Sequence, residues 1–402
     1  MELDLFAACL PGLEPLLAAE LQGLGMAPTE TAGGVEFRGD RDALLAAHLH
    51  LGTASHLLLR CARFRCRNLQ ELQTRTAQLP WPRWLRRDVP FAVRATARKS
   101  RLYHTGAIEE RVRRGVAMAL AGGGEPAAGA AVPLAAGAGV PLAAGAGIPL
   151  AVRVVDDVVA ISLDTSDEPL HRRGYRLESA KAPLREDLAH ALLRAAAFAR
   201  GQALLDPFCG AGTIAIEAAA IALALPPGRL RPPPLRGTAL ADDDRWHALV
   251  AAAVRAAAGT AGAAMPIAAS DRDAGAVAAA RRNAERAGVL HALDLRHCAV
   301  SRAPWLEHPD TAPRPLLLAT NPPFGLRVAA GRDLGNLYQT LGHLALRLGE
   351  SARTAILAHD HRLARRTGLT LRAAFTTRHG GLHVSALVGA LAAAAPSSAP
   401  PA

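Results

Sequence analysis

The sequence predicts an α/β protein in which a C-terminal Rossmann-like, doubly wound domain follows a smaller α+β arm. Three short apolar runs indicate buried strands, at residues 203–205, 266–270 and 316–320. Each run ends in a turn rich in Gly, Asp or Pro, and an Ala-rich helical pattern follows the first two. Strands that alternate with helices in this way are typical of a mostly parallel sheet.

The first turn, Asp206-Pro207-Phe208-Cys209-Gly210-Ala211-Gly212-Thr213, leads into a helix expected to start at Thr213. Gly210 and Gly212 can adopt positive φ and let the backbone approach a ligand closely. Open α/β sheets bind ligands at the carboxyl ends of their strands. The whole turn, including Cys209, is therefore predicted to hold an adenosine-containing cofactor, although such turns also serve dinucleotide binding and tight packing.

The second apolar run ends in Asp271-Arg272-Asp273, and a helix is expected over residues 274–287. A carboxylate at the tip of this strand can accept hydrogen bonds from both hydroxyls of a ribose. We assign that role to Asp271. Asp273 belongs to the same predicted site, and it is also the better candidate for the N-cap of the helix, because Asp is a preferred N-cap residue.

The third run is followed by Asn321-Pro322-Pro323-Phe324. An exocyclic amine on a purine is a poor nucleophile, but the Asn321 side-chain oxygen and the Pro322 carbonyl can accept its two N–H groups and orient its lone pair. The prolines stiffen the loop, and Phe324 can stack on the base, a contact worth roughly 1 to 3 kcal/mol. With the glycine-rich turn, this loop predicts S-adenosylmethionine-dependent methylation of an amino group.

These motifs, with His171-Arg172-Arg173-Gly174-Tyr175-Arg176 and Ala182-Pro183-Leu184-Arg185-Glu186, resemble the THUMP-domain RNA guanine-N2-methyltransferases. The resemblance is strongest to the bacterial enzymes that act on 23S ribosomal RNA. It covers nearly the whole chain, from Leu5-Phe6-Ala7-Ala8 to Arg378-His379-Gly380-Gly381-Leu382. It implies a class I methyltransferase domain preceded by ferredoxin-like and THUMP domains.

The resemblance also implies roles for single residues. Asp206, Gly210 and Gly212 would contact the methionine side of the cofactor, and Asp271 would contact its ribose. Asn321 and Phe324 would contact the target guanine. Where such enzymes usually place an Asp near the adenine, this chain carries Cys298, and Leu326 stands where an acidic residue is common. A thiol is a weak donor and acceptor, so adenine recognition at Cys298 would depend on backbone groups.

Positive charge is concentrated in one stretch of the chain. Between Arg60 and Arg114, fifteen Arg or Lys stand against four Asp or Glu, a surplus equal to the whole net charge of +11. A high-GC genome would raise the Arg content everywhere, yet the remaining residues are balanced, so the stretch predicts an RNA-binding surface. The residues expected to contact RNA are Arg83, Trp84, Arg86, Arg87, Arg98, Lys99 and Arg101.

The expected domains are a ferredoxin-like unit at 1–54, a THUMP domain at 55–176, a methyltransferase domain at 177–395 and a disordered tail at 396–402. An eight-residue repeat with Gly and Pro in each copy predicts a mobile loop at 121–150. Residues 226–244 are expected to be an insertion, with Asp242, Asp243 and Asp244 in a solvated turn rather than a metal site.

Several classes of protein are disfavoured. The sequence contains no run that resembles a membrane span and no basic start of a signal peptide, so we expect a cytoplasmic protein. Its five scattered cysteines match neither a disulfide framework nor a zinc site. We expect a monomer that binds RNA and needs no metal.

Two alternatives remain open at this level. A tRNA guanine-N2-methyltransferase would share the chemistry. A non-catalytic ribosome-assembly factor would keep the RNA-binding arm but lose tight cofactor binding, and Cys298 keeps that hypothesis open. DNA adenine-N6 methylation would share Asn-Pro-Pro-Phe but would not explain the RNA-type arm.

Overall fold

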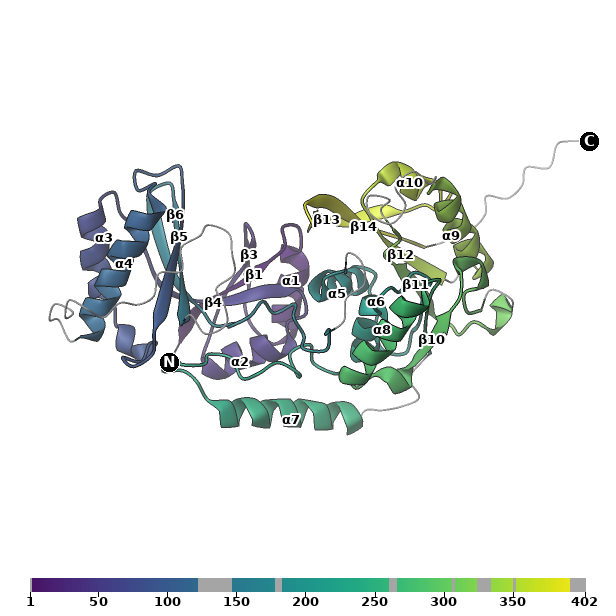
Figure 1. The fold of residues 1–402 in the computed structure, drawn as a ribbon, viewed down its shortest axis with the longest axis horizontal. Helices are drawn as coiled ribbons and strands as arrows, with labels where there is room; N and C mark the ends of the chain where they lie inside the picture. The colour runs from purple at the N-terminus through teal and green to yellow at the C-terminus, as the bar shows by residue number, and fades with distance from the viewer. Residues whose placement is uncertain are drawn as a thin grey trace, which may run out of the picture.

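The computed structural model describes residues 2–121, 147–177, 183–259, 266–305, 308–323, 334–349 and 352–390. The molecule is an elongated row (Figure 1) with helices of the arm at one end, a ferredoxin-like unit in the middle and the Rossmann-like domain at the other end. Most of the predicted loop at 121–150 and the whole predicted tail lie outside the described residues.

The N-terminal half is built on one continuous seven-stranded sheet. In spatial order its strands are β2 (Thr29–Thr31), β3 (Gly34–Gly39), β1 (Leu3–Cys9), β4 (Ala54–Arg65), β7 (Val158–Asp164), β6 (Ile148–Val155) and β5 (Phe91–Arg98). The long strand β4 pairs with β1 through its first half and with β7 beyond that. The predicted ferredoxin-like and THUMP parts therefore share a strand.

Helices cover one face of this sheet. They are α1 (Glu14–Gly23), α2 (Arg41–His50), α3 (Leu69–Ala77) and α4 (Thr105–Leu120). The side chains of Asp40 and Asn68 cap α2 and α3 by accepting a backbone N–H in the first turn. Leu59 and Leu163, which pair across β4 and β7, lie in the same core as residues of all four helices.

One boundary differs from the sequence prediction. The predicted loop was expected to extend to Leu150, but β6 begins at Ile148. Ile148, Pro149 and Leu150 pair in parallel with the start of β5, and Ile148 and Leu150 are buried. The repeat composition predicted a loop here, but backbone pairing and the burial of apolar side chains both favour a strand.

The C-terminal half is a second seven-stranded sheet. Its order is β10 (Leu293–His297), β9 (Ile267–Asp271), β8 (Ala203–Asp206), β11 (Leu316–Thr320), β12 (Ala352–Ala358), β14 (Leu382–Ala390) and β13 (Arg372–His379). The first five strands in this order are parallel, and β14 is antiparallel to both of its neighbours. This is the predicted Rossmann-like, doubly wound architecture.

Helices lie on both faces of the second sheet. They are α5 (Glu186–Ala195), α6 (Thr213–Ala222), α8 (Ala274–Arg286), α9 (Gly335–Arg347) and α10 (His361–Arg365). Leu204 packs in the core that contains residues of α5, α6 and α8, whereas its neighbour Leu205 packs with residues of α9. Since strand side chains alternate between faces, the apolar runs of this sheet are buried on both sides.

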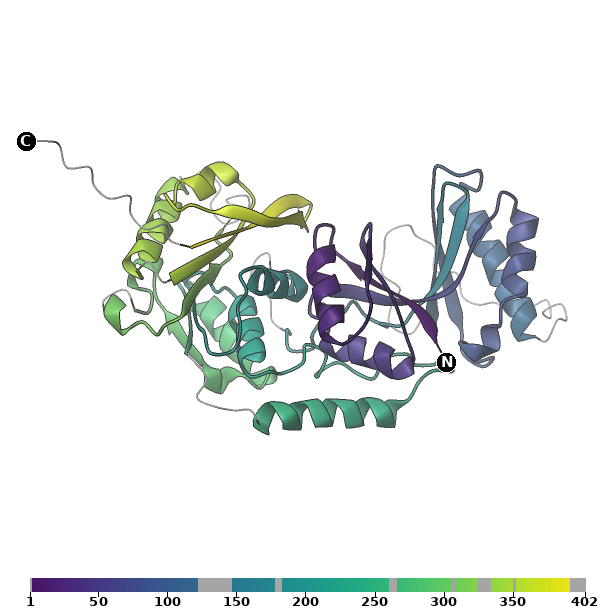
Figure 2. The ribbon, with the colours of Figure 1, turned by 180° about the vertical axis from the view of Figure 1, so that it is seen from behind.

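Residues 226–242, which we call the strap, link the two halves. They leave the Rossmann-like domain after α6 and run along the arm, where Gly228 donates to Leu49 O (2.8 Å) and Ala239 donates to Trp84 O (2.9 Å). The helix α7 (Asp243–Gly259) follows and lies beside α2 (Figures 1 and 2). The predicted solvated turn of three aspartates is therefore partly wrong, because Asp243 and Asp244 form the first turn of α7, where acidic residues are favoured.

Candidate active site

The predicted cofactor and target residues meet at one edge of the second sheet. Strand β8 has β9 on one side and β11 on the other. Because these strands are parallel, the turns after Asp206, Asp271 and Thr320 lie at the same edge. The strand order reverses between β8 and β11, and such a switch point is where open α/β sheets form a ligand-binding crevice.

The glycine-rich turn has the conformation that its sequence predicts. Gly212 has φ +85°, and a Cβ added there would lie 2.9 Å from the Ala280 Cβ, so this close packing of α6 on α8 requires Gly. Gly210 has φ +52°, and no described heavy atom lies within 4 Å of a Cβ placed there. The backbone at Gly210 therefore faces open space, which suits close approach of a ligand.

Asp271 links this turn to the second strand. Its Oδ2 accepts the Gly210 N–H at 3.0 Å, and its Oδ1 accepts the Asp273 N–H at 3.0 Å. The side chain is partly exposed, and each carboxylate oxygen has a further lone pair for a ligand hydroxyl. Asp273 caps α8 by accepting the N–H groups of Gly275 and Ala276, which confirms it as the N-cap.

Asp206 is a buried acid at the centre of the crevice. The pKa of its carboxyl group is raised to about 7, chiefly by burial and in part by the nearby Asp271 charge, against the hydrogen bonds that it accepts. Those bonds come from the Thr320 hydroxyl at 2.7 Å and the Phe208 N–H at 3.2 Å. The Thr320 bond ties the end of β8 directly to the strand that carries Asn321.

Asn321 offers a free acceptor at the same edge. Its Oδ1 atom is buried, and it has no hydrogen-bond partner among the residues that the structure describes. Pro322 is buried beside it, and Pro323 is partly exposed. A buried amide oxygen without a partner is costly unless a ligand satisfies it, so this atom fits a donor on a bound substrate. Phe324 and Leu326 lie outside the described residues.

Three further residues of the predicted cofactor site have defined surroundings. Cys298 is partly exposed just beyond β10, and its N–H donates to Asp271 O at 3.0 Å, so it lies at the expected edge. Thr213 is buried, and its hydroxyl accepts a hydrogen bond from Arg176 Nη2 at 2.8 Å. Thr213 therefore fastens the segment before α5 to the start of α6. Cys209 is buried, and burial raises the pKa of its thiol well above the usual range, as suits a packing residue.

In the arm, the predicted basic residues Arg83, Arg86, Arg87, Arg98, Lys99 and Arg101 are all exposed. Trp84 is not. Its side chain is buried and packs edge-on against the buried Trp81, with ring centroids 5.7 Å apart. The prediction that Trp84 contacts RNA therefore does not fit the structure, because a buried ring has no open face on which a base could stack. Its burial instead stabilises the arm. The exposed aromatic side chain in this region is Tyr103.

Sequence reasoning did not find the buried charge network between the two halves, which we call the latch. His190 of α5 lies between Glu20 of α1 at 3.2 Å and Glu217 of α6 at 3.1 Å. Arg173 reaches Glu217 at 3.5 Å and donates to Gly52 O at 2.5 Å. The His-Arg-Arg-Gly-Tyr-Arg segment is thus a structural connector. The three arginines and the tyrosine of this segment were the sequence signal that could have pointed to these contacts.

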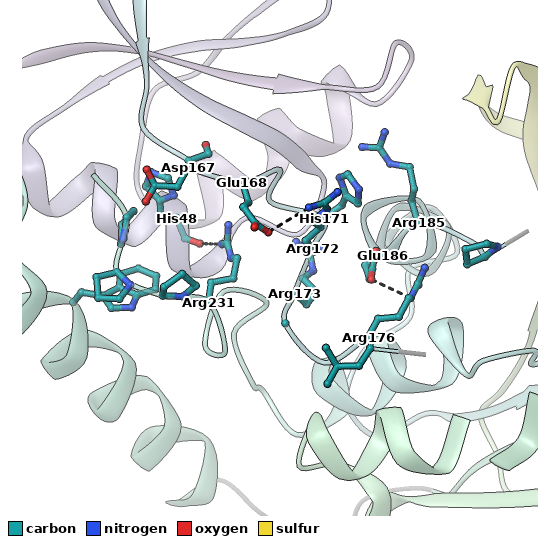
Figure 3. A pocket seen from close by; sticks show the side chains of 18 residues that line it. His48, Asp167, Glu168, His171, Arg172, Arg173, Arg176, Arg185, Glu186 and Arg231 are labelled. Carbon is teal, nitrogen blue, oxygen red and sulfur yellow. Dashed lines mark hydrogen bonds and ion pairs between the residues drawn. The ribbon is translucent and has the colours of Figure 1, made fainter. Parts of the chain in front are cut away.

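A cavity of about 610 Å³ lies beside the latch, between the connector, the strap and α7. Figure 3 shows Arg172, Arg231 and His48 around it. Burial, with the charge of Arg173, lowers the pKa of Arg231 to about 9, and its guanidinium donates to His48 O. Asp206, Asp271 and Asn321 do not line this cavity, so it is separate from the crevice.

Within the described ranges, no three His, Cys, Asp or Glu side chains are grouped so that they could hold a metal ion. No helix in the described part of the chain has the length and apolar character needed to cross a membrane. Asp242, expected above in a solvated turn, pairs with Arg41 at 3.0 Å.

Known proteins resemble both halves. The family described as "RMKL-like, methyltransferase domain" matches residues 173–382, and the "RlmL ferredoxin-like domain" matches residues 4–58. Two relatives named ribosomal RNA large subunit methyltransferase K/L, from Syntrophotalea carbinolica and Methylococcus capsulatus, are each 31% identical, over 94% and 95% of this chain. A possible methylase from Clostridium difficile 630 shares the fold, with a TM-score of 0.82 at 24% identity, and covers 97% of this chain and 98% of its own.

The match covers only part of each of these two relatives. The alignments cover 52% and 50% of the two relatives, so the chain spans about half the length of the proteins that it matches.

Proposed function

Because the chain belongs to the family of RMKL-like methyltransferase domains, we propose that it transfers a methyl group from S-adenosylmethionine to the exocyclic N2 amine of a guanosine in 23S ribosomal RNA. The observation that carries the proposal is the buried Oδ1 of Asn321 beside the crevice of β8, β9 and β11, which has no hydrogen-bond partner among the described residues. The names of the curated relatives support ribosomal RNA as the substrate.

The residues of the crevice fit the cofactor. Gly210 leaves open space at the turn, Asp271 retains acceptor capacity for ribose hydroxyls, and Asp206 offers a buried carboxyl group. The backbone of Cys298 lies next to Asp271, at the place where the adenine is expected to bind. S-adenosylmethionine, when bound, supplies an electrophilic methyl group on a sulfonium.

The target amine would be oriented by two acceptors. Asn321 Oδ1 and the Pro322 carbonyl would each take one N–H of the amine, which turns the nitrogen lone pair away from the base plane. Orientation of this kind accelerates a reaction without a strong base, because the entropy of alignment is lost on binding. Phe324 is proposed to stack on the guanine.

The substitution Asn321→Ala tests the mechanism. We expect it to reduce methyl transfer to the detection limit while cofactor and RNA affinities stay within about threefold, since the lost contact acts in the transition state. The control is Asn68→Ala, which removes the α3 cap and should cost about 1 kcal/mol of stability with transfer unchanged. Wild-type turnover in Asn321→Ala would refute the amine clamp.

The substrate is identified by the product. Purified chain would be incubated with labelled S-adenosylmethionine and 23S rRNA, tRNA or duplex DNA, and the nucleosides analysed by mass spectrometry. N2-methylguanosine in 23S rRNA is the expected result. Label in tRNA alone would reassign the substrate, and N6-methyladenine in DNA would reject the proposal. Absence of cofactor binding by calorimetry would favour a non-catalytic assembly factor.

A further inference from the structure

Six arginines share the face of the arm's sheet that the helices leave open. The strand register places them in three rows that run across β4, β7, β6 and β5. The rows are Arg60-Ser162-Ala151-Arg94, Arg63-Ala160-Arg153-Thr96 and Arg65-Val158-Val155-Arg98. Residues that pair across neighbouring strands point to the same side of a sheet, so these side chains form one surface, which we call the arginine face.

The arginine face is accessible and uniformly basic. Arg63, Arg65, Arg98 and Arg153 are exposed, whereas Arg60 and Arg94 are partly buried. The other six positions hold Ser, Ala, Thr or Val, and none of the twelve is acidic. The alternate residues of the same strands, such as Val152, Val154 and Ile161, lie in the core on the other side.

The positive charges on this face repel one another. Burial lowers the pKa of Arg60, and the positive charges of Arg153 and Arg63 lower it further, against the effect of Glu36. Glu36 lies 3.6 Å from Arg60 at the edge of the face. Like charges held together on a rigid sheet repel, and a polyanion that binds there relieves the repulsion.

None of the twelve positions is aromatic. Sheets that read single-stranded RNA stack unpaired bases on aromatic side chains, and this face offers small side chains between guanidinium groups instead. We propose that the arginine face binds the phosphate backbone of a double-helical segment of the RNA substrate. The inference rests on the proposed function for the identity of that substrate, and it replaces Trp84 with a different recognition surface.

The dimensions suit a rigid ligand. Strands lie about 4.8 Å apart, so Arg63 and Arg153, two strands apart, are separated by about 10 Å, and successive rows by about 6.7 Å. A duplex holds its phosphates in fixed positions, so it can contact several such arginines at once with little further loss of entropy. A flexible single strand would have to be ordered on the face.

The test compares two double variants of the full chain. Arg63→Ala with Arg153→Ala removes two charges from the arginine face. Arg113→Ala with Arg114→Ala removes two charges from α4, on the opposite side of the sheet. Affinity for an RNA hairpin with a stem of roughly 16 base pairs, a length that a duplex-binding domain spans, would be measured by fluorescence anisotropy over a range of salt concentrations.

We expect the first variant to bind the hairpin about tenfold or more weakly near 0.1 M salt, with a slope of log affinity against log salt smaller by about 2. The α4 variant should change affinity by less than about threefold. Equal losses in both variants, or no loss in the first, would overturn the inference. Equally tight, arginine-dependent binding of a single strand would overturn the preference for a duplex.

This outcome is separable from that of the proposed function. Both variants should bind S-adenosylmethionine as the wild type does, because the crevice lies in the other half of the molecule. The wild type could make no N2-methylguanosine in any RNA while the Arg63 and Arg153 variant still loses affinity for the hairpin. In that case the proposed function fails and the arginine face stands. The reverse pattern rejects the arginine face alone.

Discussion

At the residue scale, Asp206 shows how burial sets the charge of the crevice. Its carboxyl group is almost fully buried, and burial raises its pKa to about 7 from the usual 3.8. Between about pH 4 and pH 7, the folded protein holds a proton that the unfolded chain releases, so folding stability falls as pH rises through this range and is flat above it. The carboxyl group is therefore only partly ionised near neutral pH.

The pKa of Asp206 predicts a pH-dependent affinity for the cofactor. If its carboxylate contacts the cofactor's methionine ammonium, affinity should rise between about pH 6 and pH 8, as the carboxyl group ionises. Calorimetry of S-adenosylmethionine binding at several pH values would measure the midpoint. Asp206→Asn should bind weakly with no such dependence.

Thr320→Val is the matched control for this prediction. It removes the hydroxyl that donates to Asp206 and holds its pKa down, so the midpoint should move to higher pH while the fold is kept. An affinity that is flat in pH for the wild type would place the ammonium elsewhere.

At the element scale, α7 shows a helix held by few contacts. Only Trp246 and Ala257 are buried among its described residues. Its start is also fixed to α2 by an ion pair between Arg245 and Asp42 at 2.7 Å. Such exposed pairs contribute little stability, so the buried Trp246 ring, with the partly buried Leu249, Val250 and Ala253 packed against the same core, must supply most of the attachment.

Trp246→Ala should therefore release α7. Large aromatic truncations cost about 3 to 5 kcal/mol in a core, and Trp246 is the larger of the two buried side chains of α7. Hydrogen exchange followed by mass spectrometry should show faster exchange over residues 243–259, with β8 and β11 unchanged. Val254→Ala, at a position 37% exposed, is the control and should leave the exchange unaltered. Unchanged exchange in Trp246→Ala would mean that the surface contacts hold α7.

At the scale of the whole molecule, the latch fixes the arm against the Rossmann-like half. Burial disfavours charge on Glu217, but Arg173, His190 and Tyr175 outweigh burial and lower its pKa to about 2. Burial would lower the pKa of His190, but its hydrogen bonds with Glu20 and Glu217 raise it. Gly52 leaves room for this contact, since a Cβ there would lie 2.3 Å from the His190 ring.

The latch should be strongest in mildly acidic solution. The stabilisation from His190 is full below its unfolded pKa of about 6.5 and is lost as pH rises through its raised folded pKa. The stabilisation from Glu217 is present above about pH 4.5 and is lost as pH falls towards 2. The two ranges overlap between about pH 4.5 and 6.5.

His190→Gln should destabilise the protein by about 3 to 5 kcal/mol, because it leaves Glu20 without its buried charged partner. Urea denaturation near pH 6 would measure the loss, and small-angle scattering would show a looser arrangement of the two halves. His56→Gln, which breaks a more exposed pair with Asp164, should cost less than about 1 kcal/mol. Similar losses in both variants would show that the latch has no special part in joining the halves.

The crevice was largely readable from local sequence. Gly212, Asp271 and Asn321 each follow a short apolar run, and the end of a buried strand is a place that apolar patterning alone locates. Their convergence followed from one general rule about parallel sheets. The burial of Trp84 could not be predicted from the sequence. A Trp among arginines is compatible with a core residue and with a residue that stacks on bases until its neighbours in the fold are known.

By itself, the sequence determined the fold class, the places of the glycine-rich turn and of the Asn321 loop after two buried strands, and the concentration of charge in the arm. Only the tertiary structure decided that β4 joins two parts into one sheet, that the strap ties the halves, and that six arginines align in rows. The reason is physical: turns and strand ends are specified by neighbours in the chain, whereas register, burial and ion pairing depend on residues that are distant in sequence and meet only when the chain folds.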